Sequence, residues 1–527
     1  MCKQFLRVYN SAANHRWVGR VRVVEVNSLN RRSCYPTEVQ KKKIEREPSG
    51  KTGDKGVSST NYQPPLDRVQ REVNLLLDRA ERAAHIFSRY TTEQVQQIVE
   101  AMVQAGKEKA EFYAQWLVGE TGYGNVEDNV KKNLDCSVGL LNRYRIADFI
   151  EPEIDEEKKI ISFPKPAGVI AGLIPSTNPV MTVYYKAIIS MMTRNAIIFS
   201  PHPSGQNCSI HVIDLMAEVA ERAGAPSGAI QTIRQPSLLA LNCLMESPKI
   251  STILATGGPK RVREAYRSGN PAMGMGPGNA PCFVHESADI DTAATQIIAS
   301  NSFDHALPCV CESVVFADRT IAPQLKEALG RSGGYFVTDE AAQKLRNYLF
   351  LETGLNREAI GKSAVWIAGK VGFSVPKDTK SLLVEIHAVG DREPLSQEKM
   401  FPVMGYIRVE GIEGAIERAV AMLERMGKGH SAVIHSQDPA IVARYAAALP
   451  VCRIAVNTQG VQGSSGVSTN LTRGPVIGTG FFGGSSVDDN IGPQYLVQWS
   501  RAAYPADSTV SVPDMAEAIA RASSREA

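Results

Sequence analysis

Residues 301–312 read N-S-F-D-H-A-L-P-C-V-C-E and place Cys309 between two apolar runs. The run at 294–300 is typical of the end of a helix, and the run at 313–317 is typical of a buried strand. A cysteine at such a junction, directly after a proline that fixes the backbone, can lie in a cleft where a nucleophilic thiolate is needed. The alternative is that Cys309 and Cys311 are small buried hydrophobic residues, as most free cysteines are.

Size and composition limit what surrounds this cysteine. The 527 residues are enough for two or three domains, and 43% hydrophobic with 21% charged residues is ordinary for a soluble globular protein. No apolar run is long enough to cross a membrane, so we expect a cytoplasmic protein that is not membrane-embedded. The nine cysteines lack disulfide or zinc-ligand spacing, which predicts reduced thiols and no structural metal.

The net charge of +3 hides an asymmetry along the chain. Residues 1–60 carry 13 Lys/Arg against 5 Asp/Glu, which leaves 45 Lys/Arg against 50 Asp/Glu in the remainder. The main body therefore lacks the positive charge of a nucleic-acid-binding protein. We expect residues 1–60 to be a disordered basic extension outside the fold. A transit peptide is disfavoured by the acidic residues, and a translation start near Val57 is a further alternative.

The elements that must position Cys309 begin with a helical region. Residues 65–144 show helical spacing of apolar positions, with a helix start near 91–93. Residues 150–163 alternate around a charged segment, as in a β-hairpin. Buried strands are then expected at 168–174, 195–199, 230–233 and 250–255, with helices at 183–192 and 205–223. This alternation predicts an α/β fold with a doubly wound parallel sheet.

Ligands of such sheets bind beyond the carboxyl ends of the strands, so the loops there are candidate binding segments. The loops contain small and polar residues that let a dinucleotide backbone approach. The candidates are Pro175, Ser176 and Thr177 after the first strand, Ser200 and His202 after the second, and Gly257 and Gly258 after a later one. No G-x-G-x-x-G fingerprint is present in this region, and simple turn chemistry is the alternative for each loop.

The remaining chain divides into four parts. The segment 274–281 is rich in glycine and either lines a substrate site or connects two domains. Residues 282–456 form a second α/β unit, and 457–500 return toward the first domain, which spans 61–281. Residues 501–527 are expected to be a tail, with a flexible part at 502–512 and a small amphipathic helix at 513–523.

Several strings occur together in one order: I-P-S-T-N-P, T-R-N-A-I-I-F-S-P-H-P, I-L-A-T-G-G-P, G-x-G-x-G-N-x-P, S-F-D-x-x-x-x-C and G-x-G-x-x-G-G-x-S. From about residue 66 to 496 the chain resembles CoA-acylating aldehyde dehydrogenases. The resemblance includes the aldehyde dehydrogenase half of bifunctional alcohol/acetaldehyde dehydrogenases and the propionaldehyde enzymes of bacterial microcompartments. It implies an aldehyde dehydrogenase-like fold with a Rossmann-type NAD-binding domain, an α/β catalytic domain and a small oligomerisation element built from the hairpin and a C-terminal strand.

The resemblance also implies a mechanism. Cys309 matches the family's nucleophile, which attacks a short-chain aldehyde, and Asn178 with a backbone amide near Cys309 would bind the oxyanion. Hydride passes to NAD⁺, and coenzyme A then takes the acyl group from the cysteine thioester. Hydrolytic relatives carry a glutamate in an E-L-G-G-K string. The corresponding residues 275–279 hold no carboxylate, which favours acyl transfer to CoA over hydrolysis.

Further residues are assigned through the resemblance. Glu398 begins an E-x-x-x-P string that implies contact with the nucleotide ribose, whereas its polar flanks favour a solvated charge. Ser200 and His202 would lie on the adenosine side, and Gly257 and Gly258 on the pyrophosphate side. Contacts with substrate or CoA are implied for His430, Gly276, Gly278 and Asn279. For His430, a purely structural role is the alternative.

Other readings stay open at this level. The enzyme alternatives are a hydrolytic aldehyde dehydrogenase that releases free acid and an acylating enzyme for sulfoacetaldehyde, and NADP is an alternative to NAD. A scaffold or cargo protein is a non-enzymatic alternative, because the helix at 513–523 resembles peptides that direct enzymes into bacterial microcompartments. A homodimer or homotetramer is expected. The chain ends too soon to hold the alcohol dehydrogenase domain of the bifunctional enzymes, which predicts a single activity.

Overall fold

A computed structural model describes residues 66–507 of the chain. The predictions for residues 1–60 and for the helix at 513–523 fall outside these described residues. Across 66–507, no helix combines the length and the apolar character that crossing a bilayer requires.

The described chain begins with helices. They are α1 (Leu66–Phe87), α2 (Thr92–Glu108), α3 (Ala110–Thr121), α4 (Val126–Asp135) and α5 (Val138–Leu141), followed by the 3-10 helix η1 (Ile146–Phe149). The predicted start at 91–93 is confirmed, because Thr91 and Gln94 form a reciprocal capping box at the N-terminus of α2. Helix α3 ends at Gly122, whose φ of 68° lies in the left-handed region that glycine adopts without a steric penalty.

The first parallel sheet has the strand order β5-β4-β3-β6-β7. Its strands are β3 (Val169–Leu173), β4 (Ala196–Ser200), β5 (Ile230–Thr232), β6 (Thr252–Ala255) and β7 (Ala272–Gly274), and its helices are α6 (Pro179–Met192), α7 (Gln206–Arg222), α8 (Leu238–Met245) and α9 (Pro259–Arg267). Strand β4, which follows β3 in the chain, lies on one side of β3, and strand β6 lies on the other side. A crevice for a ligand therefore forms beyond the carboxyl ends of β3 and β6.

The two faces of this sheet pack against different helices. Along β3, Ile170 belongs to the core formed with α2, α6 and α7, whereas Val169 and Ala171 belong to the core formed with α1 and α8. All five residues of β3 and all five of β4 are buried, as expected for parallel strands covered on both faces. The helix expected at 183–192 begins earlier, at Pro179, because proline is favoured at the first helical position.

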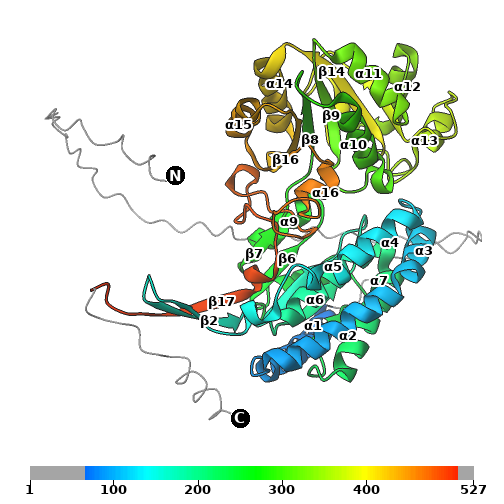
Figure 1. Cartoon of the computed structure of the whole chain (residues 1–527). Coiled ribbons are helices and arrows are strands. Elements are labelled where there is room, and N and C mark those ends of the chain that lie inside the picture. The colour runs from blue at the N-terminus through cyan, green and yellow to red at the C-terminus, as the bar shows by residue number, and fades with distance from the viewer. Residues whose placement is uncertain (1–65, 508–527) are drawn as a thin grey trace, which may run out of the picture. The chain divides into compact units, whose positions relative to one another are not determined.

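The second parallel sheet has the order β10-β13-β14-β9-β8-β15-β16 and is drawn with its helices in the upper part of Figure 1. Its strands are β8 (Ala280–Val284), β9 (Glu312–Asp318), β10 (Gly334–Phe336), β13 (Ser381–Glu385), β14 (Val403–Val409), β15 (Gly429–His435) and β16 (Val451–Val456). Its helices are α10 (Ile290–Ser302), α11 (Ala322–Arg331), α12 (Asp339–Leu349), α13 (Ala364–Lys370), α14 (Gly411–Arg425) and α15 (Pro439–Ala448), and a two-stranded ribbon joins β11 (Phe350–Leu351) to β12 (Gly354–Leu355).

A third, antiparallel sheet joins distant parts of the chain. The predicted hairpin is confirmed as β1 (Glu153–Asp155) and β2 (Ile160–Pro166), and β17 (Val497–Ala503) pairs along β2 (Figure 1). The prediction that the flexible tail begins at 502 is wrong by two residues, because Ala502 and Ala503 still pair with β2. Between β16 and β17 lie α16 (Gly460–Ser464), η5 (Phe481–Gly483) and η6 (Pro493–Leu496).

The two parallel sheets present opposite ends to the candidate site. The dinucleotide loops follow the carboxyl ends of β3, β4 and β6, whereas Cys309 precedes the amino end of β9 and His430 lies at the start of β15. The glycine-rich segment 275–279 connects the carboxyl end of β7 to the amino end of β8. The segment therefore connects the two sheets, as one interpretation predicted, and it also contacts the Cys309 loop.

Candidate active site

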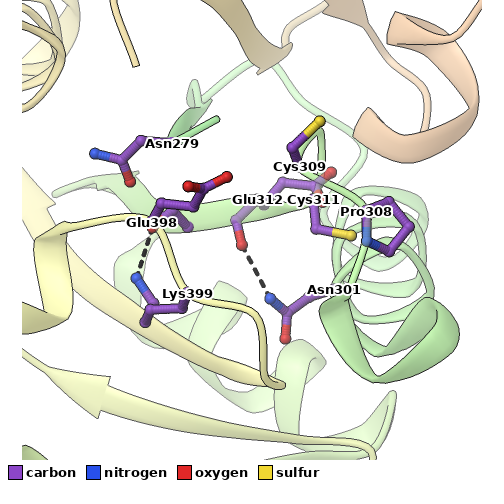
Figure 2. A pocket seen from close by; sticks show the side chains of 9 residues that line it. Asn279, Asn301, Pro308, Cys309, Cys311, Glu312, Glu398 and Lys399 are labelled. Carbon is purple, nitrogen blue, oxygen red and sulfur yellow. Dashed lines mark hydrogen bonds between the residues drawn. The ribbon is translucent and has the colours of Figure 1, made fainter. Parts of the chain in front are cut away.

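Cys309 lies where the sequence predicted, between helix α10 and strand β9. It is half-buried, whereas Cys311 is buried and its Sγ lies 3.2 Å from the backbone oxygen of Ser300. Figure 2 shows the two thiols pointing in different directions. A polar pocket lies beside them, lined by Asn279, Asn301, Pro308, Cys309, Cys311, Glu312, Ser313, Glu398 and Lys399.

His430 contacts the candidate nucleophile directly. Its Nε2 lies 3.2 Å from Cys309 Sγ, and its Nδ1 lies 3.0 Å from the hydroxyl of Ser431. Burial, with the nearby Arg453 guanidinium, lowers the pKa of His430 to about 3, so the imidazole is neutral at physiological pH. With its proton on Nδ1, the ring donates to Ser431 and its Nε2 lone pair can accept the thiol proton.

The thiol of Cys309 is not ionised by its surroundings in this state. Burial raises its pKa to about 12, and the carboxylate of Glu398 acts in the same direction. Arg453 acts in the opposite direction, because a cation stabilises the thiolate. A nucleophile with this pKa needs a base within hydrogen-bonding distance, and His430 is placed to be that base.

The turn before Cys309 has an unusual backbone. Asp304, His305 and Ala306 have φ values of 48°, 54° and 60°, three successive non-glycine residues in the left-handed region. Each such residue costs about 1–2 kcal/mol, so other contacts must hold the turn in place. They come from helix α4 and the residue that caps its N-terminus, and all converge on Asp304.

Asp304 is fully buried and bonded on both carboxylate oxygens. Oδ1 accepts hydrogen bonds from the Asn125 backbone amide at 3.0 Å and from Asn129 Nδ2 at 2.8 Å, and Oδ2 pairs with the Lys132 ammonium group. A side chain at position 124 would place its Cβ 1.9 Å from Asp304 Oδ1, which explains the glycine there. Helix α4 therefore fixes the turn that leads to Cys309.

Lys132 also connects this turn to Asn178. Its Nζ donates a 2.7 Å hydrogen bond to Asn178 Oδ1, and Asn178 is the residue that precedes helix α6. Since the ammonium group only donates, Oδ1 is the atom that faces Lys132. Asn178 Nδ2 donates to the Thr177 hydroxyl at 3.2 Å and keeps a second N–H. Asn178 does not line the pocket that contains Cys309.

The residue-based expectation that Glu398 is a solvated charge is wrong. Glu398 is half-buried, and its Oε1 accepts a 2.9 Å hydrogen bond from the Gly278 backbone amide. In Figure 2 its carboxylate extends toward the loop that carries Cys309. Burial raises the pKa of Glu398 to about 7. Burial also lowers the pKa of the neighbouring Lys399, which donates to Ser313 Oγ at 2.6 Å, to about 7.

The glycine-rich segment supplies close backbone contacts. A Cβ on Gly278 would lie 1.9 Å from the backbone oxygen of Cys309, so only glycine fits against the nucleophile loop. Asn279 is buried, and its amide group donates to the backbone oxygens of Ser396 and Met426 at 2.9 and 3.2 Å. Gly276 donates to Thr479 Oγ1 at 3.3 Å and lies outside the pocket.

The candidate dinucleotide loops meet at one sheet edge. Pro175, Ser176 and Thr177 follow β3, Ser200 ends β4, His202 follows it, and Gly257 and Gly258 follow β6. Gly258 precedes α9 without a capping side chain, and a Cβ built on it meets no atom within 4 Å. Pro259 has no N–H, and the Arg261 amide donates to the Gly258 oxygen, so Lys260 is the residue of the first turn whose amide is open to an anion such as a pyrophosphate. These features fit a dinucleotide, although these loops lack the usual glycine fingerprint.

Comparison with known proteins agrees with this arrangement. The model of the aldehyde dehydrogenase family matches residues 65–333, which is half of the chain. The chain belongs to the aldehyde dehydrogenase family. It is 35% identical over 443 residues to the bifunctional aldehyde-alcohol dehydrogenase AdhE of Escherichia coli strain K12, covering 83% of this chain and 50% of AdhE. The chain therefore spans about half the length of that curated relative.

Solved structures of the family are similar along most of their length. An acetylating aldehyde dehydrogenase from Geobacillus thermoglucosidasius is 38% identical, with a TM-score of 0.81 over 84% of this chain and 98% of that one. A propionaldehyde dehydrogenase from Rhodopseudomonas palustris, solved with CoA and an acylated cysteine, is 26% identical, with a TM-score of 0.75 over 82% and 97%. One from the fucose utilisation bacterial microcompartment of Clostridium phytofermentans is 28% identical, with a TM-score of 0.76 over 83% and 98%.

Three buried charged residues of this site escaped the sequence reasoning. Lys132 lies in a helix rich in charged residues and looks no different from Lys131, so no local pattern distinguishes it. Glu312 begins strand β9 and is 1% exposed. Arg453 is 4% exposed and donates to the backbone oxygen of His430 at 2.7 Å. An arginine inside the apolar run 451–456 is a signal that could have been noticed.

Proposed function

We propose that this protein is a CoA-acylating aldehyde dehydrogenase that oxidises a short-chain aldehyde to its acyl-CoA with NAD⁺, reversibly. The observation that carries the proposal is the 3.2 Å contact between Cys309 Sγ and His430 Nε2. It gives the half-buried thiol a neutral base. The family membership and the acetylating enzymes among its similar structures support the same reaction.

In the first step the chain activates and positions its nucleophile. His430 accepts the proton of Cys309 as the sulfur bonds to the aldehyde carbon, and a thiohemiacetal forms. The developing oxyanion needs donors that are already oriented, and the free N–H of Asn178 with a backbone amide near Cys309 is assigned this role. Lys132 stabilises the donor by fixing the orientation of the Asn178 amide.

The dinucleotide would bind across the edge where β3, β4 and β6 end. The open N-terminus of α9 with Gly257 and Gly258 is assigned to its pyrophosphate, Ser200 and His202 to its adenosine, and Glu398 to the ribose near the reacting ring. The bound nucleotide supplies the hydride acceptor that converts the thiohemiacetal into a thioester. NAD is the proposed cofactor and NADP the alternative, because the loop after β4 offers no lysine for a further phosphate.

The second half of the reaction transfers the acyl group to CoA. Once His430 has released its first proton to solvent, it accepts the thiol proton of CoA as the CoA sulfur attacks the thioester carbon. The bond to Cys309 then breaks, and the proton passes from His430 to the leaving thiolate. Residues 275–279 hold no carboxylate at the position from which hydrolytic relatives activate water, so the thioester survives until CoA arrives. The segment with Gly276, Gly278 and Asn279 is assigned to substrate and CoA contacts.

Assembly and location are part of the proposal. The β1-β2-β17 sheet is the proposed oligomerisation element of a homodimer or homotetramer, because β2 and β17 offer extended strands outside the two parallel sheets. A similar enzyme comes from a bacterial microcompartment, which supports encapsulation of this protein as well. Loss of co-purification with shell proteins after deletion of residues 513–527 would test that role.

NADH formation by the full chain tests the reaction. Acetaldehyde or propionaldehyde is supplied with NAD⁺ or NADP⁺, with and without CoA, and the product is identified by mass spectrometry. CoA-dependent NADH with acyl-CoA as product is expected, and Cys309→Ala abolishes it while Cys311→Ala retains it. Equal NADH formation without CoA, with free acid as product, would contradict the proposal. No turnover with any short aldehyde would favour a binding protein.

A further inference from the structure

The pocket beside Cys309 contains unsatisfied polar atoms. Asn279 Oδ1 and Glu312 Oε2 are both buried, and neither has a hydrogen-bond partner among residues 66–507. Both residues line the pocket, which has room for about one water molecule. A buried acceptor without a partner is unfavourable, so a water in the pocket that donates to either atom would stabilise the site. Cys309 also lines this pocket (Figure 2).

Glu398 gives this pocket a carboxylate close to the place where hydrolytic relatives have one. It accepts its hydrogen bond from Gly278, which belongs to the 275–279 segment that itself lacks an acid. Its second oxygen, Oε2, accepts no hydrogen bond from any described residue. Glu398 lines the same pocket as Cys309. Its pKa of about 7 lets it take up and release a proton near neutral pH.

We propose that Glu398 acts as the general base for a slow, CoA-independent hydrolysis of acyl-Cys309 by a water held in this pocket. The inference rests on the proposed function, since it needs the acyl-enzyme. Glu398 takes one proton from the water as the water oxygen bonds to the acyl carbon. The carbon–sulfur bond then breaks, and the proton passes from Glu398 to the leaving Cys309 thiolate. The products are a carboxylic acid and the free thiol, and no electrons are exchanged.

The proposed hydrolysis is a side reaction for a structural reason. Glu398 is also assigned to the ribose of the nucleotide, so its carboxylate is free for water only while the nucleotide is absent. CoA competes at the same thioester. Acid release is therefore confined to acyl-enzyme that has lost its nucleotide and has not yet met CoA.

Other titratable groups near Glu398 could also make the hydrolysis rate depend on pH. Lys399 lies next to it in the chain, Glu312 faces the same pocket from β9, and His430 contacts Cys309 from β15 with Arg453 behind it. The pKa of His430 is about 3, so a rate that rises through pH 7 does not come from the histidine. Glu312 has a raised pKa of about 7 as well. Variants must therefore separate the two carboxyl groups.

Acetylation by p-nitrophenyl acetate, without NAD or CoA, isolates this step. The burst of p-nitrophenol counts the reactive Cys309 thiols, and the following steady rate reports hydrolysis of acetyl-Cys309. The wild-type rate is expected to rise as pH increases through about 7. Glu398→Gln is expected to keep the burst and lower the steady rate tenfold or more, because general base catalysis contributes about 10²–10⁴-fold. Glu327→Gln, on the exposed surface of α11, is the matched control.

The outcomes separate this inference from the proposed function. A steady rate in Glu398→Gln within twofold of wild type overturns the inference, as does a loss that appears only in Glu312→Gln. If Glu398→Gln gives no burst, Glu398→Asp is used, and its shorter carboxylate should lower the steady rate without abolishing it. CoA-dependent NADH formation by the wild type with no measurable ester hydrolysis overturns this inference alone. Absence of both the burst and CoA-dependent NADH overturns the proposed function.

Discussion

Lys132 forms a buried ion pair with Asp304, and its ammonium group also donates to Asn178 Oδ1 at 2.7 Å. One side chain of helix α4 thus joins the left-handed turn before Cys309 to the loop after β3. The turn is unfavourable by itself, and the side chain of Asp304 holds it in place through three hydrogen bonds. The position of the nucleophile and the orientation of the candidate oxyanion donor therefore depend on the same cation.

Lys132→Met is expected to lower the free energy of unfolding by about 3–5 kcal/mol, because it leaves the Asp304 carboxylate buried without its partner. Urea unfolding at pH 7 measures this change, and NADH formation per folded molecule should fall as well. Lys131→Met is the control, since Lys131 is exposed and its pairs with Glu127 and Asp128 contribute at most about 1 kcal/mol. Equal stability of the two variants would contradict the role given to Lys132.

Gly278→Ala is expected to abolish turnover, because its Cβ would lie 1.9 Å from the Cys309 backbone oxygen and force the nucleophile loop to move. Loss of the iodoacetamide reactivity of Cys309, read by mass spectrometry, would show the displacement directly. Gly330→Ala is the control, since a Cβ there meets no atom within 4 Å and alanine in helix α11 should stabilise it by up to about 1 kcal/mol. Wild-type kcat in Gly278→Ala would refute the close contact.

His430→Gln tests whether the histidine is the base for the thiol. Its removal is expected to lower kcat about 10²–10⁴-fold, with the KM for NAD⁺ within about threefold of wild type. Because burial lowers the pKa of His430 to about 3, its basic form is present throughout pH 5–9 and should give no acidic limb there. His435→Gln is the control, since His435 ends the same strand, is also buried and has a pKa lowered to about 4. A similar loss of kcat in both variants would indicate a general packing defect.

The sequence predicted those parts of the site that depend on local pattern. The strands before the binding loops were visible as short apolar runs, and Cys309 was visible as a polar junction between a helix and a strand. The hairpin of β1 and β2 was predicted from alternation around a charged turn. These features depend on neighbouring residues, so the sequence carries them directly.

Features that depend on packing between distant segments could not be predicted. Lys132 and Asp304 are 172 positions apart, and nothing near either one indicates that they pair. Glu398 has polar neighbours in sequence, but in the fold it lines a pocket with the Cys309 loop and the start of β9, and burial there raises its pKa. The base for Cys309 was likewise recognised only as a histidine that matched a relative. Its 3.2 Å approach to the thiol is visible only in the fold.

The carboxyl group of Glu312 should make stability depend on pH. It is 1% exposed, and burial raises its pKa from 4.5 to about 7. Between pH 4.5 and 7 the carboxyl group is protonated in the folded protein but ionised in the unfolded chain. Its contribution to the free energy of unfolding is therefore complete below about pH 4.5. It is lost as pH rises through about 7, where the folded protein must hold a buried charge. The loss amounts to roughly 3 kcal/mol for a shift of this size.

Glu312→Gln removes this titration, since a glutamine can still accept the hydrogen bond from Gly460 but carries no charge. We expect the difference in unfolding free energy between wild type and Glu312→Gln to move in favour of the variant as pH rises from 5 to 7.5. Urea unfolding at several pH values measures it, and Glu327→Gln on the exposed face of α11 should follow the wild type. A constant difference between wild type and Glu312→Gln would mean that Glu312 is ionised in the folded protein throughout this range.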